Sequence, residues 1–328
     1  MVKETERFLL EIKSLTTYFY TEDGIVKAVD GVDFNVKEGE ILGLVGESGC
    51  GKSVTALSLL QLVASPPGRI VDGRIEFLGS DLLTLSSREN HAIRGQKISM
   101  IFQDPLTCLN PVLKVGYQLS EVFHYHRGLN WKKSLAEAVR MLKITDIPSP
   151  EERVRNFPHE MSGGMRQRSM IAMALSCEPA LLIADEPTTA LDVTVQAQVL
   201  NLMKDLCRQR DTAVLLITHD MGVVAHMCNR VAVMYAGRIV EFADVFTIFK
   251  KPAHPYTEGL LFSLPRLGAK RDRLDSIEGQ PPQLNRLPAG CAFQPRCRYA
   301  SQRCSQQPPE LETIQAGHTI RCFNPING

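Results

Sequence analysis

The sequence predicts an α/β fold with a parallel sheet at its centre. Three short apolar runs, at 41–45 (ILGLV), 181–185 (LLIAD) and 213–218 (AVLLIT), have the length and composition of strands buried on both faces. Segments with apolar residues at helical spacing lie between these runs, and this alternation is typical of α/β domains. A glycine-rich turn directly after the first run has the pattern of a phosphate-binding loop. We therefore expect a nucleotide-binding α/β domain.

An antiparallel region is expected before the first apolar run. Apolar and polar residues alternate over about the first forty residues, and turns are predicted at Asp23-Gly24 and Glu38-Gly39. Such alternation is typical of strands with one face buried and the other facing water. We expect these strands to form an antiparallel addition to the α/β core.

A helical insertion is expected between about residues 108 and 178. Before it, the pattern predicts a helix over 53–63 and a strand over 98–102. Within the insertion, the segment 134–143 (SLAEAVRMLK) carries apolar residues at a spacing that places them on one helical face. These residues are Leu135, Ala138, Val139 and Leu142.

The C-terminal part begins with a predicted hairpin and then loses its regular pattern. The segment 231–242 (VAVMYAGRIVEF) predicts two strands that turn at Ala236-Gly237. Beyond about residue 250, proline and cysteine become frequent and no helical or strand period is evident. We expect little regular secondary structure in this last segment.

Composition and charge argue against several classes of protein. The net charge is +1, so we expect no general nucleic-acid-binding or polybasic membrane-binding surface. The first residues, MVKETERFLLEIK, mix charges and lack the apolar region of a signal peptide. No run of about 18 apolar residues occurs. The sequence therefore predicts a cytoplasmic protein that binds no nucleic acid and does not span a bilayer by itself.

The segment 46–53, GESGCGKS, matches the phosphate-binding pattern G-x-x-x-x-G-K-[S/T] between an expected strand and an expected helix. The glycines allow backbone N–H groups to close around phosphate oxygens, and the helix N-terminus adds positive potential. Lys52 is expected to reach the β- and γ-phosphates, and Ser53 to ligate magnesium. A plain glycine-rich turn is the alternative. The residues predicted to bind nucleotide here are Gly46, Glu47, Ser48, Gly49, Cys50, Gly51, Lys52 and Ser53.

Cys50 has two interpretations. A thiol close to a helix N-terminus and to Lys52 can have a lowered pKa, which would make it redox-sensitive. Alternatively, cysteine is simply a small residue that fits the loop, and we prefer this second interpretation.

Two adjacent acidic residues stand at the C-terminal end of the run 181–185. Asp185 stands at the C-terminal end of the expected strand, where it can bind magnesium through water. Glu186 is the natural general base for an attacking water molecule. A solvated strand end is the alternative. With the phosphate-binding pattern, the two acids predict a nucleoside triphosphatase.

The segment 161–168, MSGGMRQR, resembles the signature of ATP-binding cassette (ABC) proteins, L-S-G-G-Q. Ser162, Gly163 and Gly164 match the signature, whereas Met161 and Met165 depart from it. The motif opens a helix, whose N-terminal amides can hold an anion, and it precedes LLIADEP by about 20 residues. The chain is thus similar to ABC ATPases over about residues 8–245.

This resemblance implies roles for further residues. Gln103, in FQDP, corresponds to the glutamine that senses magnesium and the attacking water, and His219, in ITHD, to the histidine that contacts the γ-phosphate. Asp192, in TALD, belongs to the D-loop. The catalytic residues are then Glu186, His219 and Gln103, and the expected magnesium ligands are Ser53, Gln103 and Asp185. A strand-end cap or a core histidine is the alternative role for His219.

An aromatic side chain that stacks on adenine is also implied near residue 19. Spacing from the first expected strand selects Phe19, with Tyr18 and Tyr20 as alternatives. For each of the three, a position in the core is the competing interpretation.

The resemblance also implies an architecture. It predicts a RecA-like core with an antiparallel β subdomain and an α-helical subdomain, here residues 1–245 with the helices at about 108–178, followed by an extension at 246–328. In this family two such domains enclose two ATP molecules head to tail. Ser162, Gly163 and Gly164 would then face the nucleotide of the partner subunit, and Asp192 is counted among the nucleotide-binding residues.

The segment 254–265, HPYTEGLLFSLP, resembles the C-terminal extension of di- and oligopeptide importer ATPases. This likeness implies an ATPase subunit at the cytoplasmic face of the bacterial inner membrane. Its partners would be a second ABC ATPase subunit, two transmembrane permease subunits and, through the complex, an extracytoplasmic solute-binding protein. An importer of another small solute, such as nickel or a modified peptide, and a soluble ABC ATPase that acts on ribosomes or DNA are the alternatives.

Four of the nine cysteines lie in the last 38 residues, at Cys291, Cys297, Cys304 and Cys322. Disulfides are not expected in the cytosol, so the cluster predicts a metal site. The spacing C-x5-C-x6-C-x17-C differs from the C-x2-C pairs of structural zinc sites, and thiolates suit either zinc or an iron–sulfur cluster. Some peptide-importer ATPases carry a 4Fe–4S cluster on matching cysteines, so the resemblance favours that cluster. Zinc and unmetallated thiols are the alternatives.

Overall fold

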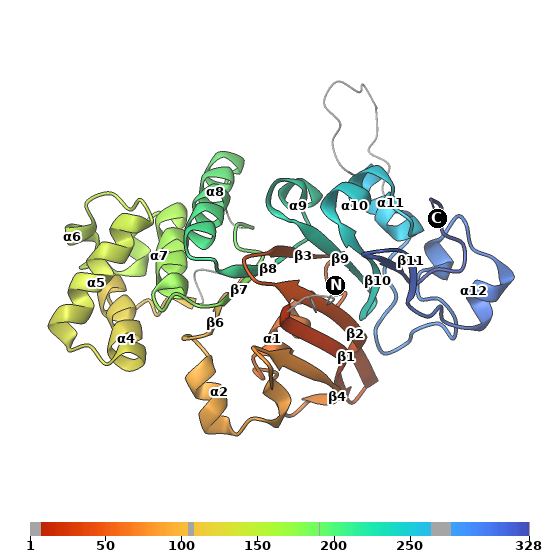
Figure 1. Ribbon diagram of the computed structural model, residues 1–328, viewed down its shortest axis with the longest axis horizontal. Helices are drawn as coiled ribbons and strands as arrows, with labels where there is room; N and C mark the ends of the chain where they lie inside the picture. The colour runs from red at the N-terminus through yellow and green to blue at the C-terminus, as the bar shows by residue number, and fades with distance from the viewer. Residues whose placement is uncertain (1–7, 104–107, 190, 264–276, 328) are drawn as a thin grey trace, which may run out of the picture. The chain divides into compact units, whose positions relative to one another are not determined.

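The computed structural model describes residues 8–103, 108–189, 191–263 and 277–327 (Figure 1). Contacts divide the chain into two compact units. The first contains the chain up to Lys37, Ile41–Thr84 and everything from Ile217 onward, and the second contains Glu38–Glu40 and Leu85–Leu216. The expected C-terminal extension thus lies in the same unit as the N-terminal strands. The domain boundary at residue 245 stays a prediction.

The first unit contains the antiparallel sheet expected at the N-terminus. Its strands run in the order β2-β1-β4-β5. The turn predicted at Asp23-Gly24 joins the two longest strands, and Gly24 has a φ of 118°. The elements are β1 (Phe8–Thr21), β2 (Gly24–Lys37), β4 (Gly68–Phe77), β5 (Ser80–Asp81) and the 3-10 turn η1 (Leu82–Thr84).

A second set of strands in the first unit runs in the order β11-β12-β10-β9-β3. Among these described strands, β3 and β9 pair in parallel, whereas the pairs β9–β10, β10–β12 and β11–β12 are antiparallel. The hairpin of β9 and β10 turns at Ala236-Gly237, as predicted. The strands are β3 (Ile41–Val45), β9 (Arg230–Tyr235), β10 (Arg238–Asp244), β11 (Glu312–Gln315) and β12 (His318–Ile320). The helices are α1 (Lys52–Leu59), α9 (Met221–Met227), α10 (Val245–Lys250), α11 (Pro255–Phe262), η3 (Gln294–Arg296) and α12 (Gln302–Gln306).

The second unit contains the expected helical insertion and the remaining strands. Its strands are neighbours in the order β8-β7-β6, and β6 pairs with β7 in parallel. They are β6 (Ile98–Ile101), β7 (Leu181–Asp185) and β8 (Ala213–Thr218), the last of which continues into the first unit. The helices are α2 (Ser87–Ile93), α4 (Val115–Arg127), α5 (Trp131–Ile144), α6 (Pro150–Arg153), η2 (Pro158–Glu160), α7 (Gly163–Leu175) and α8 (Val193–Gln209).

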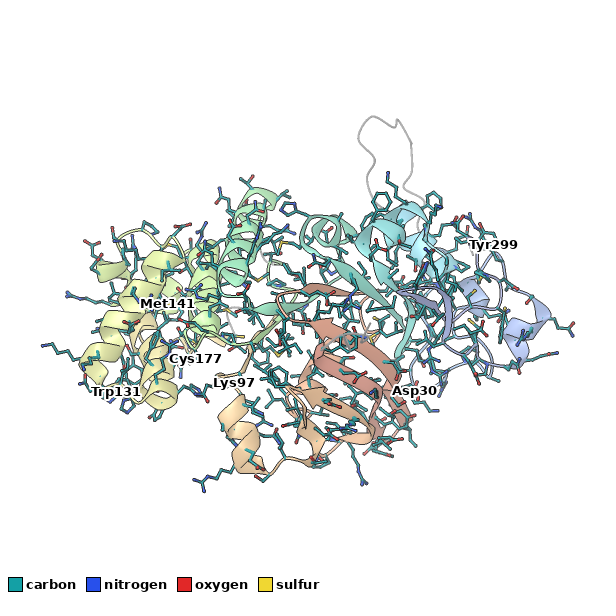
Figure 2. The ribbon with its side chains drawn as sticks, in the orientation of Figure 1. Asp30, Lys97, Trp131, Met141, Cys177 and Tyr299 are labelled. Carbon is teal, nitrogen blue, oxygen red and sulfur yellow. The ribbon has the colours of Figure 1, made fainter. Side chains whose placement is uncertain are left out.

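The predicted buried face of α5 is partly wrong. Leu135 is 45% exposed, whereas Ala138, Met141 and Leu142 are buried and form one stripe along the helix. Figure 2 labels Met141 among the helices of this unit. Ser134 completes the stripe, since its hydroxyl donates to the Leu129 carbonyl at 3.4 Å. A hydrogen-bonded serine can thus occupy a core position that apolar spacing assigns to the neighbouring leucine.

The C-terminal segment is attached to β10 through a buried carboxylate, which the sequence did not predict. Glu241 is fully buried and accepts hydrogen bonds from the backbone N–H groups of Ala253 (2.7 Å) and His254 (3.0 Å) and from His318 Nε2 (2.8 Å). Burial alone would raise the pKa of Glu241, but hydrogen bonds led by the one from His318 outweigh it and lower that pKa. Strand β12 pairs with β10, so the C-terminal segment contains a strand where we expected irregular chain.

His254 is buried next to this carboxylate. Its Nδ1 accepts a hydrogen bond from the Tyr256 N–H at 3.0 Å, which caps α11. Burial disfavours the imidazolium form and lowers the pKa of His254 to about 4, from an ordinary value of 6.5.

Between about pH 4 and pH 6.5, the unfolded chain binds more protons at His254 than the folded chain does. The free energy of unfolding should therefore fall as the pH drops from 6.5 toward about 4, by up to about 3 kcal/mol from this residue. Urea unfolding at several pH values in that range measures the slope. His254→Asn keeps an acceptor for the Tyr256 N–H and removes the titration, so its slope should be shallower. Equal slopes in the two proteins would refute the assignment.

Candidate nucleotide-binding site

The phosphate loop joins a buried strand to a helix, as its sequence predicts. All five residues of β3 are buried, and α1 begins at Lys52 directly after Gly51. Ser48 and Gly49 are exposed at the tip of the loop, whereas Ser53 is half-buried in the first helical turn. The expected strand–loop–helix context is therefore present.

Two glycines of the loop are required by both backbone conformation and space. A Cβ on Gly46 (φ 155°) would lie 2.2 Å from the Met234 carbonyl oxygen, and one on Gly51 (φ 111°) would lie 2.1 Å from the Ala28 carbonyl oxygen. Gly49 also has a positive φ, of 78°, but a Cβ there would meet nothing within 4 Å. The loop thus owes its shape to close packing against neighbouring backbone.

Lys52 is folded into the loop and is only 5% exposed. Its Nζ donates to the carbonyl oxygens of Gly46 at 2.8 Å and Glu47 at 3.0 Å. The ammonium group is therefore held within the loop, where it would meet an anion bound by the loop's N–H groups.

Cys50 is buried in the same loop. Burial raises the pKa of the thiol, and nearby Lys52 opposes this rise without reversing it. A redox-sensitive thiol would need a lowered pKa, so the geometry supports the interpretation of Cys50 as a small residue that fits the loop.

The three aromatic residues considered for adenine differ in their surroundings. The Tyr18 hydroxyl donates to Asp30 at 2.5 Å, and Asp30 also pairs with Arg238 at 2.7 Å; Figure 2 labels Asp30 on β2. Phe19 is half-buried against the backbone of Gly68, where an added Cβ would lie 2.8 Å from its ring. Tyr20 is 48% exposed. The adenine role of Phe19 stays a prediction.

His219 lies in the first unit, on the exposed connection between β8 and α9. The backbone after it is fixed by Asp220, whose carboxylate accepts the N–H groups of Gly222 at 2.7 Å and Val223 at 3.3 Å. The Asp220 N–H in turn donates to the Thr218 hydroxyl at 3.0 Å. His219 is thus presented by an ordered turn, and its contact with a γ-phosphate stays a prediction.

In the second unit, Gln103 and Glu186 come together although 83 residues separate them. Gln103 Nε2 donates to Glu186 Oε2 at 3.0 Å. The pairing follows from the parallel strands β6 and β7, whose carboxyl ends lie at the same edge of the sheet. Glu186 has a left-handed φ of 45°, which is uncommon for a residue with a side chain.

Thr189 is a further member of this group that sequence reasoning missed. Its hydroxyl donates to the same Glu186 oxygen at 3.0 Å. Threonine three residues after a glutamate is too common a pattern to have indicated this contact. Asp185, one residue earlier, is buried at the end of β7, and its predicted role as a magnesium ligand is not tested by these contacts.

The signature segment and the D-loop lie side by side in the second unit. Ser162 caps α7, with its hydroxyl accepting the Met165 N–H at 3.3 Å, and Asp192 caps α8, with its carboxylate accepting the Val195 N–H at 3.0 Å. A Cβ on Gly164 would lie 2.9 Å from Val195, and one on Gly163 would lie 3.4 Å from Leu191. Glycine at position 164 therefore allows the two helix N-termini to approach.

The predicted site residues are divided between the two units. The phosphate loop, Phe19 and His219 belong to the first. Gln103, Asp185, Glu186, Asp192 and the signature residues belong to the second. The hydrogen bonds and packing contacts described above for each half lie within its own unit.

The four C-terminal cysteines line one small cavity of about 10 Å³. Burial raises the pKa of Cys291 and Cys297, and burial together with the three neighbouring thiols raises that of Cys322 to about 12. Among the described residues, no group of three or more His, Cys, Asp or Glu side chains is arranged to hold a metal ion. The four thiols thus share one cavity without being arranged around an ion, and the predicted metal centre stays a prediction.

The steric role of Gly51 can be separated from its backbone conformation. Gly51→Ala and Gly49→Ala both place a Cβ at a positive φ, but only the first also forces contact with the Ala28 carbonyl. Without nucleotide, Gly51→Ala should destabilise the protein by about 1–3 kcal/mol more than Gly49→Ala. Urea unfolding of the two purified variants measures the difference, and equal losses would contradict the packing argument.

Comparisons with known proteins agree with these features. Residues 29–189 match the family described as "ABC transporter", and residues 240–304 match "Oligopeptide/dipeptide transporter, C-terminal region". The oligopeptide transport ATP-binding protein AppD of Bacillus subtilis is 51% identical, over 96% of both chains. OppD of Salmonella typhimurium is 51% identical over 97% of this chain and 94% of its own, and the dipeptide transport protein DppD of Bacillus subtilis is 49% identical over 96% and 94%.

Solved structures support the fold. The dimeric post-hydrolysis structure of the ATP-binding cassette MJ0796 with ADP and Pi has a TM-score of 0.65 at 26% identity, and covers 72% of this chain and 98% of its own. CbiO1 of Clostridium perfringens has a TM-score of 0.63 at 26% identity, with 75% and 92% covered. None of the helices in the described part of the chain has the length and apolarity that a membrane span requires.

The predicted fold class, family and enzymatic activity are thereby confirmed. The match extends over both the nucleotide-binding part and the C-terminal region, and the phosphate loop has the required geometry. The chain belongs to the family of oligopeptide and dipeptide ABC transporter ATP-binding proteins, and it is an ATPase.

Proposed function

We propose that the chain powers the import of di- and oligopeptides by binding and hydrolysing ATP. The observation that carries this proposal is the presence, in one chain, of the cassette and the C-terminal region of peptide transporters, at about half identity to AppD, OppD and DppD over nearly the full length. The alternative is that the same machinery imports another small solute, and a transport assay distinguishes this from peptide import.

The phosphate loop would hold the β- and γ-phosphates of ATP. Its N–H groups and the Lys52 ammonium provide positive potential inside a loop that packing has already shaped. Phe19 would stack on the adenine. Catalysis would then consist mainly of positioning and charge stabilisation, since phosphoryl transfer requires little covalent chemistry from the protein.

Magnesium would be held by oxygen atoms of Ser53, Gln103 and Asp185. These hard donors, one of them a buried carboxylate at a strand end, suit this ion. When bound, magnesium neutralises charge on the phosphate oxygens.

Glu186 would act as the general base for the attacking water. Its Oε2 is fixed by two donors, Gln103 and Thr189, so the carboxylate is oriented before the substrate arrives. His219 would contact the γ-phosphate.

The signature segment would serve a second ATPase subunit. The N-termini of α7 and α8 lie side by side and present Ser162, Gly163 and Gly164 next to Asp192. In this proposal they complete the nucleotide site of the partner, so that ATP closes the pair and hydrolysis opens it. The dimeric form named in the MJ0796 structures is consistent with such pairing. Two permease subunits and an external solute-binding protein would complete the transporter at the cytoplasmic face of the membrane.

Glu186→Gln should retain ATP binding and lower turnover by roughly 100-fold or more, because the amide cannot accept the proton of water. Phosphate release and equilibrium nucleotide binding measure the two effects separately. Glu151→Gln, on the exposed surface of α6, is the matched control and should turn over at the wild-type rate. Near-normal hydrolysis by Glu186→Gln would exclude Glu186 as the base.

The transport role is tested with the chain assembled with its membrane subunits. ATP-dependent uptake of a labelled peptide should be present in the wild-type complex and absent with Glu186→Gln. Uptake of nickel but not peptide would assign the solute differently, and ATPase activity with no copurifying membrane subunit would favour a soluble ABC ATPase.

We also propose that the four C-terminal cysteines hold a thiophilic metal centre, a 4Fe–4S cluster, with zinc as the alternative. Support comes from their lining a single cavity and from N–H groups directed at two sulfurs, Ser301 to Cys304 at 3.5 Å and Asn324 to Cys322 at 3.3 Å. The donor type fits both metals.

Anaerobic purification and metal analysis distinguish these possibilities. A cluster should give an absorbance band near about 400 nm that Cys297→Ser removes. A colourless protein with stoichiometric zinc would establish the smaller centre. Protein that contains neither metal when prepared anaerobically would overturn this proposal.

A further inference from the structure

A bidentate ion pair joins the phosphate loop to the C-terminal segment. Arg296 Nη1 lies 2.7 Å from Glu47 Oε2, and Nη2 lies 2.9 Å from Oε1. Glu47 is the second residue of the phosphate loop, whereas Arg296 ends η3, 249 residues later. The Arg296 side chain is only 4% exposed and that of Glu47 26%, so the pair is less exposed to water than an ordinary surface ion pair.

The guanidinium group is fixed by further acceptors. Its Nε donates to the Glu278 carbonyl at 2.9 Å, Nη2 to the Ile277 carbonyl at 3.3 Å and Nη1 to the Tyr235 hydroxyl at 3.3 Å. Arg296 therefore reaches Glu47 from a position that is already determined, and little side-chain entropy is lost when the pair forms.

A second contact holds the same loop residue. The Glu47 N–H donates to the Tyr256 hydroxyl at 2.8 Å. Tyr256 is fully buried, and its ring packs on Tyr235 and Phe293 with centroid distances of 4.6 and 5.4 Å. Two parts of the C-terminal segment thus bind Glu47, one through its backbone and one through its carboxylate.

The negative charge of Glu47 explains why the ion pair with Arg296 is needed. A loop that binds a polyanionic nucleotide carries a carboxylate of its own, and an unpaired carboxylate there would repel the phosphates. Arg296 cancels this charge, and the fork of two hydrogen bonds keeps the carboxylate turned toward the C-terminal segment.

We propose that Arg296 is a positioning residue for ATP, which offsets the charge of Glu47 and makes the C-terminal segment a working part of the nucleotide site. The inference rests on ATP binding by the phosphate loop and is independent of the solute. It also connects the four-cysteine cavity to that loop, because Phe293 lines the cavity and Arg296 immediately precedes Cys297.

Equilibrium binding of a fluorescent ATP analogue to the purified full-length chain tests the charge argument. Arg296→Gln should weaken binding roughly ten-fold at low salt, and the loss should shrink at high salt. The double variant Glu47→Gln/Arg296→Gln removes both charges, so its affinity should return to within about three-fold of wild type. Failure of the wild-type chain to bind would count against the proposed function, whereas a double variant that binds as weakly as Arg296→Gln alone would overturn only this inference.

Arg296→Lys covers the case in which the neutral variant does not fold. The ammonium keeps the charge without the fork, so affinity should stay within about three-fold of wild type. A ten-fold loss in this variant, with an unchanged urea midpoint, would show that charge compensation is not the role of Arg296.

Hydrogen exchange gives a readout that does not depend on affinity. Coupling between two sites is reciprocal, so ATP should slow exchange in the segment 290–304 of the wild-type chain. The double variant Arg296→Gln/Glu47→Gln, measured at saturating ATP, should lose this protection. Exchange in 290–304 that is indifferent to ATP in the wild type would contradict the coupling.

Discussion

The phosphate loop keeps its shape because other backbone segments of the first unit close on it. The carbonyl oxygens of Ala28 and Met234 leave room for nothing larger than glycine at positions 51 and 46. Tyr256 and Arg296 then hold Glu47 from the other end of the chain. The N–H groups of a phosphate-binding loop are directed at the phosphate and do not pair with a neighbouring strand. Contacts from neighbouring segments must therefore fix the conformation of the loop.

The C-terminal segment can supply this order only because it is itself anchored. Glu241, which is fully buried on β10, accepts hydrogen bonds from two backbone N–H groups and from the His318 side chain. A buried carboxylate is costly without partners and strongly directional with them. It therefore fixes the start of α11, from which the Tyr256 hydroxyl accepts the Glu47 N–H of the phosphate loop. The contacts of Glu241 thus help to determine the geometry of the phosphate loop, although Glu241 is not part of that loop.

Sequence reasoning succeeded where the physical signal is local. The phosphate loop, the hairpin turn at Ala236-Gly237 and the acids that end β7 are read from a few adjacent residues. It failed where a long-range partner decides the outcome. Ser134 occupies the core because its hydroxyl finds a carbonyl, and Arg296 meets Glu47 across 249 residues. No spacing rule contains either contact.

The two halves of the site are ordered by different means. In the second unit, Glu186 is oriented by Gln103 and Thr189, which converge on one oxygen because β6 and β7 run in parallel. In the first, the loop is ordered by packing and by the paired charge of Glu47. The contacts named here lie within one unit each, so they order each half before nucleotide binds. ATP then need not build either half, and its binding energy remains available for the conformational change that we propose to drive transport.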